Sequence, residues 1–515
     1  MEENMKFIKN VLFRRSTFLA VAILAQIVIL IGVIAKFNDY FVFFYMVSTV
    51  LSIIIVGIIL NNDMHPVYKL AWIIPILLFP VFGGVFYLLF GGSKLGKRSK
   101  KKLKSITEET ENLLDKRDSI LEEIKSKNKF AAQQARYIQN YAKYPPYYNT
   151  ESRYLKSGEE HFKELKKQLR KAEKYIFLEY FIIAEGEMWD TILDILIEKA
   201  ESGVEVRLIY DDLGCLQTLP YKYQEKLKKL GIKVAIFNPL FPILSIKHNN
   251  RDHRKIVVID GETAFTGGIN LADEYINKID RFGHWKDSGI MLQGAAVWNM
   301  TVMFLSMWQH LTGVEENINE YKADIPSAQK SKKDGYIQPF ADSPLDNEAV
   351  GEMVYLNLIT KAEDYIYITT PYLILDNEMI TALTSAAKAG VDVRIITPHI
   401  PDKWYVHLVT RSYYEILMAS GVKVYEYQPG FIHSKTYVAD DNYGGVGTIN
   451  MDYRSLFLHF ECGVWLYKCS TIQDMKDDFE TTLEKCKKIT KEDLEEQKWY
   501  KSLVGSVLRV FAPLM

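Results

Sequence analysis

The first part of the chain alternates long apolar runs with short polar ones. Residues 18–35, 41–60 and 70–90 carry no charge and are mostly apolar. About 20 helical residues cross roughly 30 Å of bilayer hydrocarbon, and a secretory signal would supply only one such run. The pattern therefore predicts a membrane anchor over residues 1–92 with these three segments as transmembrane helices. Prolines and glycines in the third segment also allow a buried or re-entrant helix.

Basic residues around these segments indicate their orientation. The larger group follows the third segment and comprises Lys94, Lys97, Arg98, Lys100, Lys101, Lys102 and Lys104. By the positive-inside rule this end lies in the cytosol. A smaller group before residue 18 favours the same side, whereas three crossings put the two ends on opposite sides. We expect the larger group to prevail, so that the chain after residue 92 is cytosolic. Either the N-terminus is then outside or one segment does not cross.

The polar region at residues 93–149 is expected to be a basic and helical connector. Apolar residues recur at helical spacing within its charged sequence, which is typical of an amphipathic helix. The run YPPYYN at residues 144–149 then ends any helix, because proline lacks the amide donor that a helix needs.

Two stretches with the same order of strand and helix patterns follow. In residues 150–322, KYIFLEYFII and VEVRLIYDD predict strands around an amphipathic helix that ends at Gly203. In residues 347–490, DYIYITTPYLI and VDVRIITPH enclose a similar helix that ends at Gly390. Both stretches continue through a second helix into a short strand, GIKVAIFNP or GVKVYEYQP. The sequence therefore predicts an α/β fold of two tandem repeats.

Two further segments complete the predicted domain organisation. The hydrophilic residues 323–346 are expected to link the two repeats. Residues 491–515 form a C-terminal segment that ends in SLVGSVLRVFAPLM. This ending suits either a packed helix or an amphipathic helix on a membrane surface.

One motif occurs once in each repeat. The first copy, HRKIVVIDGETAFTGGIN, begins at His253, and the second, HSKTYVADDNYGGVGTIN, begins at His433. Without a gap, the two copies share a His, a Lys, an Asp, a Gly and an Asn at the same offsets. These are His253, Lys255, Asp260, Gly267 and Asn270 in the first copy, and His433, Lys435, Asp440, Gly447 and Asn450 in the second.

Two interpretations of this motif compete. It could be a pair of buried strands that begin near a polar turn, and short motifs do match by accident. Alternatively it binds a phosphate: Lys supplies charge, Asn an amide donor, and His can attack phosphorus or carry a proton. Two complete copies in one chain favour the phosphate site.

The motif HxKxxxxD, followed by a Gly-containing turn and Asn, resembles the signature of the phospholipase D superfamily. The chain is most similar to its bacterial cardiolipin synthase branch, from about Leu70 to Met515. The similarity includes WIIPILLFPVFGGVFYLLFGG, LEYFII, GVEVRLIYDDLG, NMDYRSL and the terminal APLM. It implies that both repeats pack around one active site and that the enzyme needs neither a metal nor another cofactor.

A phosphodiester exchange in two steps needs a nucleophile and an opposing proton donor. The resemblance assigns attack on phosphorus to His253 and proton donation to His433. Charge and hydrogen bonds around the phosphate oxygens would stabilise the transition state, and would come from Lys255, Lys435, Asn270 and Asn450. Asp260 and Asp440, the remaining members of the predicted catalytic set, are expected to hold the motif turn by hydrogen bonds.

A nucleophilic His usually needs a partner that fixes its tautomer. By resemblance, a carboxylate downstream of each motif serves this purpose. Glu461 stands where the second repeat should carry it, and Asp287 is the matching candidate in the first repeat. Both could instead be surface ion-pair residues. His459 occupies a place where the family usually has Asn, which could disturb the hydrogen bonds of Glu461.

Net charge and cysteine usage narrow the function. A net charge of −1 gives no basic footprint for nucleic acid, which argues against a nuclease of the same superfamily. The four cysteines have neither metal-ligand nor disulfide spacing, as suits the cytosolic side of a cell membrane.

The expected activity is phosphatidyl transfer between two phosphatidylglycerol molecules, giving cardiolipin and glycerol through a phosphohistidine. The expected partners are phosphatidylglycerol and membrane lipid, and the oligomeric state is left open. A phospholipase D-type hydrolase, or a transferase that uses another alcohol, is the nearest alternative. A non-catalytic membrane scaffold is disfavoured because both motif copies keep His and Lys.

Overall fold

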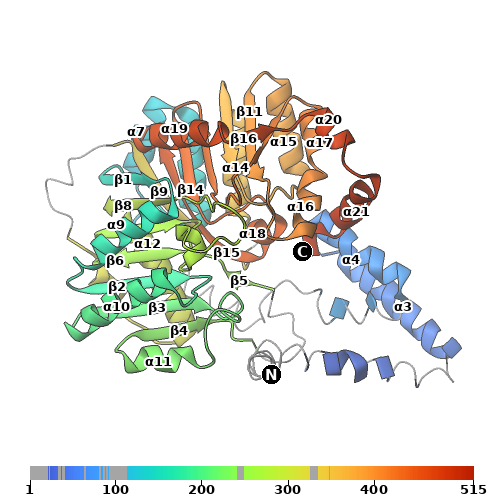
Figure 1. Ribbon diagram of the computed structural model, residues 1–515, viewed down its shortest axis with the longest axis horizontal. Coiled ribbons are helices and arrows are strands. Elements are labelled where there is room, and N and C mark those ends of the chain that lie inside the picture. The colour runs from blue at the N-terminus through green and yellow to red at the C-terminus, as the bar shows by residue number, and fades with distance from the viewer. Residues whose placement is uncertain are drawn as a thin grey trace.

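Two α/β halves lie against each other in the computed structural model, the first drawn in green and the second in orange and red (Figure 1). The structure describes residues 41–62, 65–80, 113–240, 249–324, 334–346 and 348–514, with isolated positions between 21 and 36 and between 83 and 91. Two apolar helices, α3 and α4, extend from the second half beside the C-terminal helix α21 (Figure 1).

The first half is built on a seven-stranded sheet of order β1-β8-β7-β6-β2-β3-β4. Its strands are β1 (Thr150–Leu155), β2 (Tyr175–Tyr180), β3 (Glu205–Asp211), β4 (Lys233–Phe237), β6 (Ile256–Ile259), β7 (Thr263–Gly267) and β8 (Gly289–Gly294). Strands β2, β3 and β4 pair in parallel. This is possible because helices α10 (Glu187–Glu201) and α11 (Tyr223–Lys229) connect the end of one strand to the start of the next. The predicted strands and helices of the first repeat are therefore confirmed.

The second half repeats this arrangement in a nine-stranded sheet. The strands β14-β13-β10-β11-β12 follow the order of β7-β6-β2-β3-β4. Their bounds are β10 (Tyr365–Thr369), β11 (Asp392–Pro398), β12 (Lys423–Tyr427), β13 (Thr436–Ala439), β14 (Tyr443–Gly447), β15 (His459–Tyr467) and β16 (Cys486–Lys488). The crossover helices are α15 (Asn377–Lys388), α16 (Trp404–Arg411) and α17 (Tyr414–Met418). The predicted two-repeat α/β fold is thus confirmed.

A shared apolar core holds the two sheets together. Helices α12 (Val297–Thr312) and α19 (Thr471–Leu483) contribute to it. Within this core, Phe177 and Ile209 of the first sheet join Phe304 of α12 and Val438 and Val464 of the second sheet. All five are at most 2 % exposed, so separating the halves would expose a large apolar surface to water.

Strand β5 (Arg251–Asp252) joins the two halves, and strand β9 (Tyr336–Asp342) extends the sheet of the second half. The short strand β5 leaves the first half and pairs in parallel with β15 of the second. Strand β9 pairs with β15 over its whole length. Part of the predicted linker, residues 323–346, is therefore a sheet strand, while residues 325–333 lie outside the described residues. The domain boundaries themselves stay predictions.

Helices cover the outer faces of both sheets. On the first sheet lies α9 (Gly158–Leu169), packed with α10 and α11. On the second lie α14 (Val350–Lys361), α15 and α17, joined by α7 (Asp118–Lys127) and α8 (Lys129–Tyr137). The remaining elements are η2 (Ile138–Ala142), η4 (Asp273–Ile276), η5 (Ile318–Tyr321), α18 (Tyr453–Phe457), α20 (Lys491–Glu495), α21 (Trp499–Val510) and η6 (Ala512–Leu514). Helices α7 and α8 confirm the helical part of the predicted connector, whereas residues 93–112 are outside the described residues.

At the N-terminus, α3 (Phe41–Leu60) and α4 (Pro66–Leu78) form a helical pair. Ile55 and Ile59 pack against Trp72 and Ile76 between them, and the Tyr68 hydroxyl of α4 donates to a backbone oxygen of α18. Within the part of the chain that the structure describes, no helix combines the length and apolar character needed to cross a membrane. The three transmembrane segments stay a prediction, and most of residues 18–35 lie outside the described residues.

Candidate active site

The start of each motif is hydrogen-bonded to the backbone of the opposite half. The lead-in to the first motif pairs with β15, and the His253 N–H donates to the Phe460 carbonyl over 2.9 Å. In the second motif the His433 N–H donates to the Lys286 carbonyl over 2.7 Å, next to a parallel bridge between Lys286 and Ile432. Because each half hydrogen-bonds the histidine of the other in this way, both histidines lie at the boundary between the halves.

The exchange gives each imidazole a carboxylate from the other repeat. Nδ1 of His253 lies 2.9 and 3.0 Å from the two oxygens of Glu461. Nδ1 of His433 lies 2.7 Å from Oδ2 of Asp287. Both carboxylates are completely buried, so they are not surface ion-pair residues. A carboxylate at Nδ1 keeps the proton there, and Nε2 is left with its lone pair.

Hydrogen bonds from other residues fix both carboxylates. Glu461 accepts from the hydroxyls of Thr448 and Ser455, the latter over 2.6 Å. Asp287 accepts from the Ser288 N–H over 2.8 Å. A Cβ at Gly268 would lie 2.1 Å from Asp287 Oδ1, so only glycine leaves room for this carboxylate. Neither Thr448 nor Ser455 was expected at the site from the sequence, although Ser455 lies in the run NMDYRSL.

The two motif lysines are buried beside the imidazoles. Nζ of Lys255 donates to the His253 carbonyl over 2.6 Å, and Nζ of Lys435 donates to the His433 carbonyl. Each ammonium has three donors. Each lysine therefore keeps further donors for a phosphate while the backbone holds it in place.

The two motif asparagines differ in their surroundings. Asn270 is held at both ends of its amide, because Oδ1 accepts from the Ile182 N–H over 3.0 Å and Nδ2 donates to the Tyr275 hydroxyl over 2.7 Å. The Tyr275 ring in turn lies 5.7 Å from the His433 ring. The side-chain oxygen of Asn450 has no hydrogen-bond partner among the described residues. Asn270 therefore links Ile182 and Tyr275 within the site, and its second side-chain N–H is left for a further acceptor.

The carboxylates of Asp260 and Asp440, which belong to the predicted catalytic set, bind backbone N–H groups. The Asp260 carboxylate accepts from three consecutive backbone N–H groups at the start of β2, each over 2.8 Å. The Asp440 carboxylate does the same at the start of β10, each over 2.9 Å. Strands β6 and β13 separate these carboxylates from the imidazoles. Both Asp residues therefore anchor the motif turn to the neighbouring strand by hydrogen bonds, which agrees with the expectation from the sequence.

Burial lowers the pKa values of all four basic groups, and neighbouring cations add to this for His253, His433 and Lys435. Burial, then the charges of Lys255 and Lys435, lowers the pKa of His253 well below its usual value. Burial and Lys435 lower the pKa of His433 to about 4, although Asp287 opposes this. Burial lowers the pKa of Lys255 to about 8 and that of Lys435 to about 7. At neutral pH both imidazoles are neutral. A bound anion would stabilise the protonated forms of the histidines and lysines, so the site favours an anionic ligand.

His459 is a third histidine at the site. Its ring centroid lies 5.6 Å from that of His253, and its Nδ1 lies 3.8 Å from a Glu461 oxygen. Both ring nitrogens are buried without a hydrogen-bond partner among the described residues. The expected disturbance of Glu461 does not occur, because Thr448 and Ser455 hold its carboxylate.

Among the residues that the structure describes, two groups of side chains have ligand atoms close enough for a metal ion. The first is His253, His459 and Glu461, but the Glu461 oxygens already accept from His253 and two hydroxyls. The second is His65, Asp376 and Glu378, where α4 meets the second half. There the His65 Nδ1 accepts from a backbone N–H over 3.4 Å, so Nε2 carries the proton of the neutral ring. Both groups are better explained by hydrogen bonds and ion pairing.

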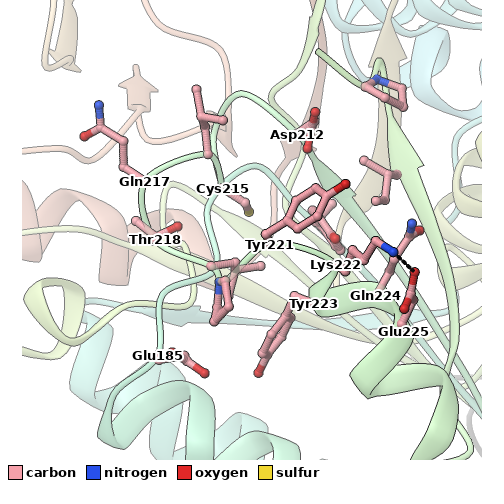
Figure 2. Close-up of a pocket in the computed structure, with 16 residues that line it drawn as sticks. Glu185, Asp212, Cys215, Gln217, Thr218, Tyr221, Lys222, Tyr223, Gln224 and Glu225 are labelled. Carbon is pink, nitrogen blue, oxygen red and sulfur yellow. Dashed lines mark ion pairs between the residues drawn. The ribbon is translucent and has the colours of Figure 1, made fainter. Parts of the chain in front are cut away.

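A cavity of about 770 Å³ lies on the first half beside this site (Figure 2). Its lining is largely polar and includes Asp212, Gln217 and Tyr221. Cys215 in its wall contacts the Phe181 carbonyl, and the Phe181 ring lies 5.1 Å from the His253 ring. Cys215 and Phe181 therefore connect the wall of this cavity to the neighbourhood of His253.

Comparisons with known proteins agree with this geometry. A family model described as "Cardiolipin synthase, PLD-like domain" matches residues 165–284 and 355–483. A second, described as "Phospholipase_D-nuclease N-terminal", matches residues 50–92. The structure is similar to that of a phosphatidylserine synthase from Haemophilus influenzae, with a TM-score of 0.56 and 17 % identity over 74 % of this chain and 97 % of that chain. This last similarity shows the fold.

Curated relatives extend the similarity over nearly the whole chain. A cardiolipin synthase from Halalkalibacterium halodurans is 35 % identical over 92 % of this chain and 94 % of its own. Cardiolipin synthase 2 from Bacillus cereus is 36 % identical over 91 % of this chain and 90 % of its own. The chain belongs to the cardiolipin synthase family of phospholipase D-like proteins.

Proposed function

We propose that the protein transfers a phosphatidyl group from one phosphatidylglycerol to another, giving cardiolipin and glycerol. The central observation is the pair of buried imidazoles, each held at Nδ1 by a carboxylate of the opposite repeat. This leaves two Nε2 atoms for one phosphate, as a nucleophile and as an acid or base. Membership in the cardiolipin synthase family supports the choice of substrate.

In the first step, the neutral Nε2 of His253 attacks phosphorus and forms a P–N bond. The P–O bond to the glycerol headgroup breaks, and His433 gives its proton to the departing oxygen. His433 is neutral in the free protein, because its pKa is about 4. It can serve as the acid because the negative charge of a bound phosphodiester raises its pKa. Lys255 and Lys435 stabilise the charge that develops on the phosphate oxygens.

In the second step, the headgroup hydroxyl of another phosphatidylglycerol replaces glycerol. His433, now neutral, removes the proton of this hydroxyl while its oxygen attacks phosphorus. The P–N bond then breaks, which releases cardiolipin and restores His253. Water competes for the same intermediate, so the exclusion of water separates a synthase from a hydrolase.

Binding of an anionic phosphodiester is expected to take up protons near pH 7.5. Lys435, with a pKa of about 7, and His433, with a pKa of about 4, are mostly deprotonated in the free protein at this pH. The bound anion raises both pKa values, so protons return and affinity falls as pH rises. Calorimetry with a phosphonate analogue of phosphatidylglycerol in two buffers of different ionisation enthalpy measures the uptake. Lys435→Arg, which stays charged, should reduce it; a binding heat independent of buffer would refute this coupling.

We further propose that the N-terminal helices hold the protein in the cell membrane and that both repeats face the cytosol. The apolar side chains of Val42, Phe43 and Ile53 on α3 are more than 60 % exposed, which suits contact with lipid. The basic residues 94–104 favour the cytosolic side.

Protease protection tests this orientation. In intact spheroplasts, externally added protease should leave the chain after residue 92 uncut, and lysis should allow cleavage. Cleavage within either repeat before lysis would reverse the assignment.

Expression in a host without its own cardiolipin synthases tests the function. We expect cardiolipin to appear with the wild-type gene and not with His253→Ala. Accumulation of phosphatidic acid without cardiolipin would favour the hydrolase.

A further inference from the structure

An apolar surface lies outside the active site on two helices of the second half. It is formed by exposed side chains at the start of α16 and along α21, and we call it the α16–α21 surface. Its members are Trp404, Tyr405, Trp499, Tyr500, Leu503, Val504, Val507 and Val510. Trp499 is 77 % exposed and Trp404 65 %. So many exposed apolar residues on neighbouring helices mark an interaction site.

Helix α21 is fixed with this surface turned outward. A Cβ at Gly505 would lie 3.0 Å from the Leu408 carbonyl of α16, so glycine permits the close approach of the two helices. Arg509 donates to the Ser412 carbonyl, and its guanidinium lies 4.1 Å from the centre of the Tyr413 ring.

The spacing of the exposed residues agrees with this packing. Positions 499, 503, 507 and 510 are three or four residues apart and share one face of a helix. Position 505 lies two residues from both 503 and 507, about 200° away around the helix, and so on the opposite face.

The local charge suits an anionic partner. Between residues 497 and 514 there is no acidic residue, and Lys498 and Lys501 are exposed, whereas Arg509 faces α16 and its neighbours. An amphipathic helix with basic residues beside an apolar, aromatic face is typical of helices that lie in the interface of an anionic membrane. Trp and Tyr rings also prefer this layer.

The surface is continuous with the apolar N-terminal helices. The short helix η6 follows α21 and contacts α4, and Figure 1 shows α21 beside α4. On α4, Leu77 and Leu78 are also more than half exposed.

We propose that the α16–α21 surface lies in the interfacial layer of a membrane rich in anionic phospholipid and docks the second repeat on the lipid that it converts. This inference rests on the proposed function for the identity of the lipid. A second copy of the chain is the competing occupant, and the experiment below distinguishes the two.

Lipid contact can be measured on the full chain in nanodiscs of phosphatidylglycerol and phosphatidylcholine. In a Cys486→Ser background the three other cysteines are buried, so Leu503→Cys can be labelled with a fluorophore. Lipids that carry a nitroxide near the headgroup should quench it at least about threefold more than the same label in an Ile279→Cys control. Ile279 is 54 % exposed on the first half. Equal quenching at both positions would overturn the proposal.

Activity gives a second readout. Leu503→Gln with Val507→Gln should lower the rate on phosphatidylglycerol vesicles about tenfold. The rate in detergent-mixed micelles, where the substrate is dispersed, should not change. Ile279→Gln with Val314→Gln is the matched control and should behave as wild type in both assays. Loss of self-association instead of vesicle activity would assign the surface to a second copy. A wild type that is inactive on both vesicles and micelles would refute the proposed function and leave the quenching result standing.

Discussion

Alanine at either His253 or His433 is expected to lower kcat by at least about 10³-fold, because one imidazole cannot be both nucleophile and opposing acid. The two losses should not add in the double variant, since both residues act on one phosphate. Steady-state assays with phosphatidylglycerol measure both effects. His399→Ala, which changes a half-exposed ring in the second half, is the control and should keep nearly full activity.

The covalent intermediate distinguishes the two histidines. Acid-sensitive label from a phosphatidyl donor should be trapped on His253 after rapid quenching. Label on His433 would exchange the two roles, and full activity of either alanine variant would remove the two-histidine mechanism.

Asp287→Asn and Glu461→Gln are each expected to lower kcat by about 10²- to 10⁴-fold, because an amide no longer fixes the imidazole tautomer. The crossed hydrogen bonds predict which histidine each variant affects. Asp287, in the first repeat, contacts His433, whereas Glu461, in the second, contacts His253. Asp287→Asn should therefore weaken the acid, and Glu461→Gln should weaken the nucleophile.

A phosphatidyl ester of p-nitrophenol separates these effects. Its leaving group departs without a proton, so the first step no longer needs His433. The burst of p-nitrophenol should be largely restored in Asp287→Asn and His433→Ala, and should stay low in Glu461→Gln and His253→Ala. If Asp287→Asn behaves like His253→Ala, the crossed pairing is wrong.

The sequence could predict the site residues but not their pairing. Periodicity and the duplicated motif predicted two α/β repeats, with His253 and Lys255 in the first and His433 and Lys435 in the second. Which carboxylate serves which histidine depends on β5 and β15, which pair across about 200 residues of chain. No local pattern contains this information. For the same reason the hydroxyl of Thr448, at the position of Gly268 in the other motif copy, gave no signal.

The roles of the individual motif residues also depend on hydrogen bonds that only the structure shows. Asp260 and Asp440 share the motif with the histidines, yet their carboxylates bind the backbone at the far ends of β6 and β13. The low pKa values of Lys255 and Lys435 arise from burial of four basic groups together. Burial of that kind follows from the packing of the two halves and is not visible in residue spacing.

Product analysis tests the proposed synthase activity most directly. Purified full-length protein is incubated with phosphatidylglycerol vesicles, and cardiolipin, free glycerol and phosphatidic acid are quantified over time. The paired imidazoles and a second lipid as acceptor predict cardiolipin and glycerol in equal amounts, with phosphatidic acid as a minor product. Phosphatidic acid as the main product across the active pH range would show that water accepts the phosphatidyl group, and would contradict the synthase.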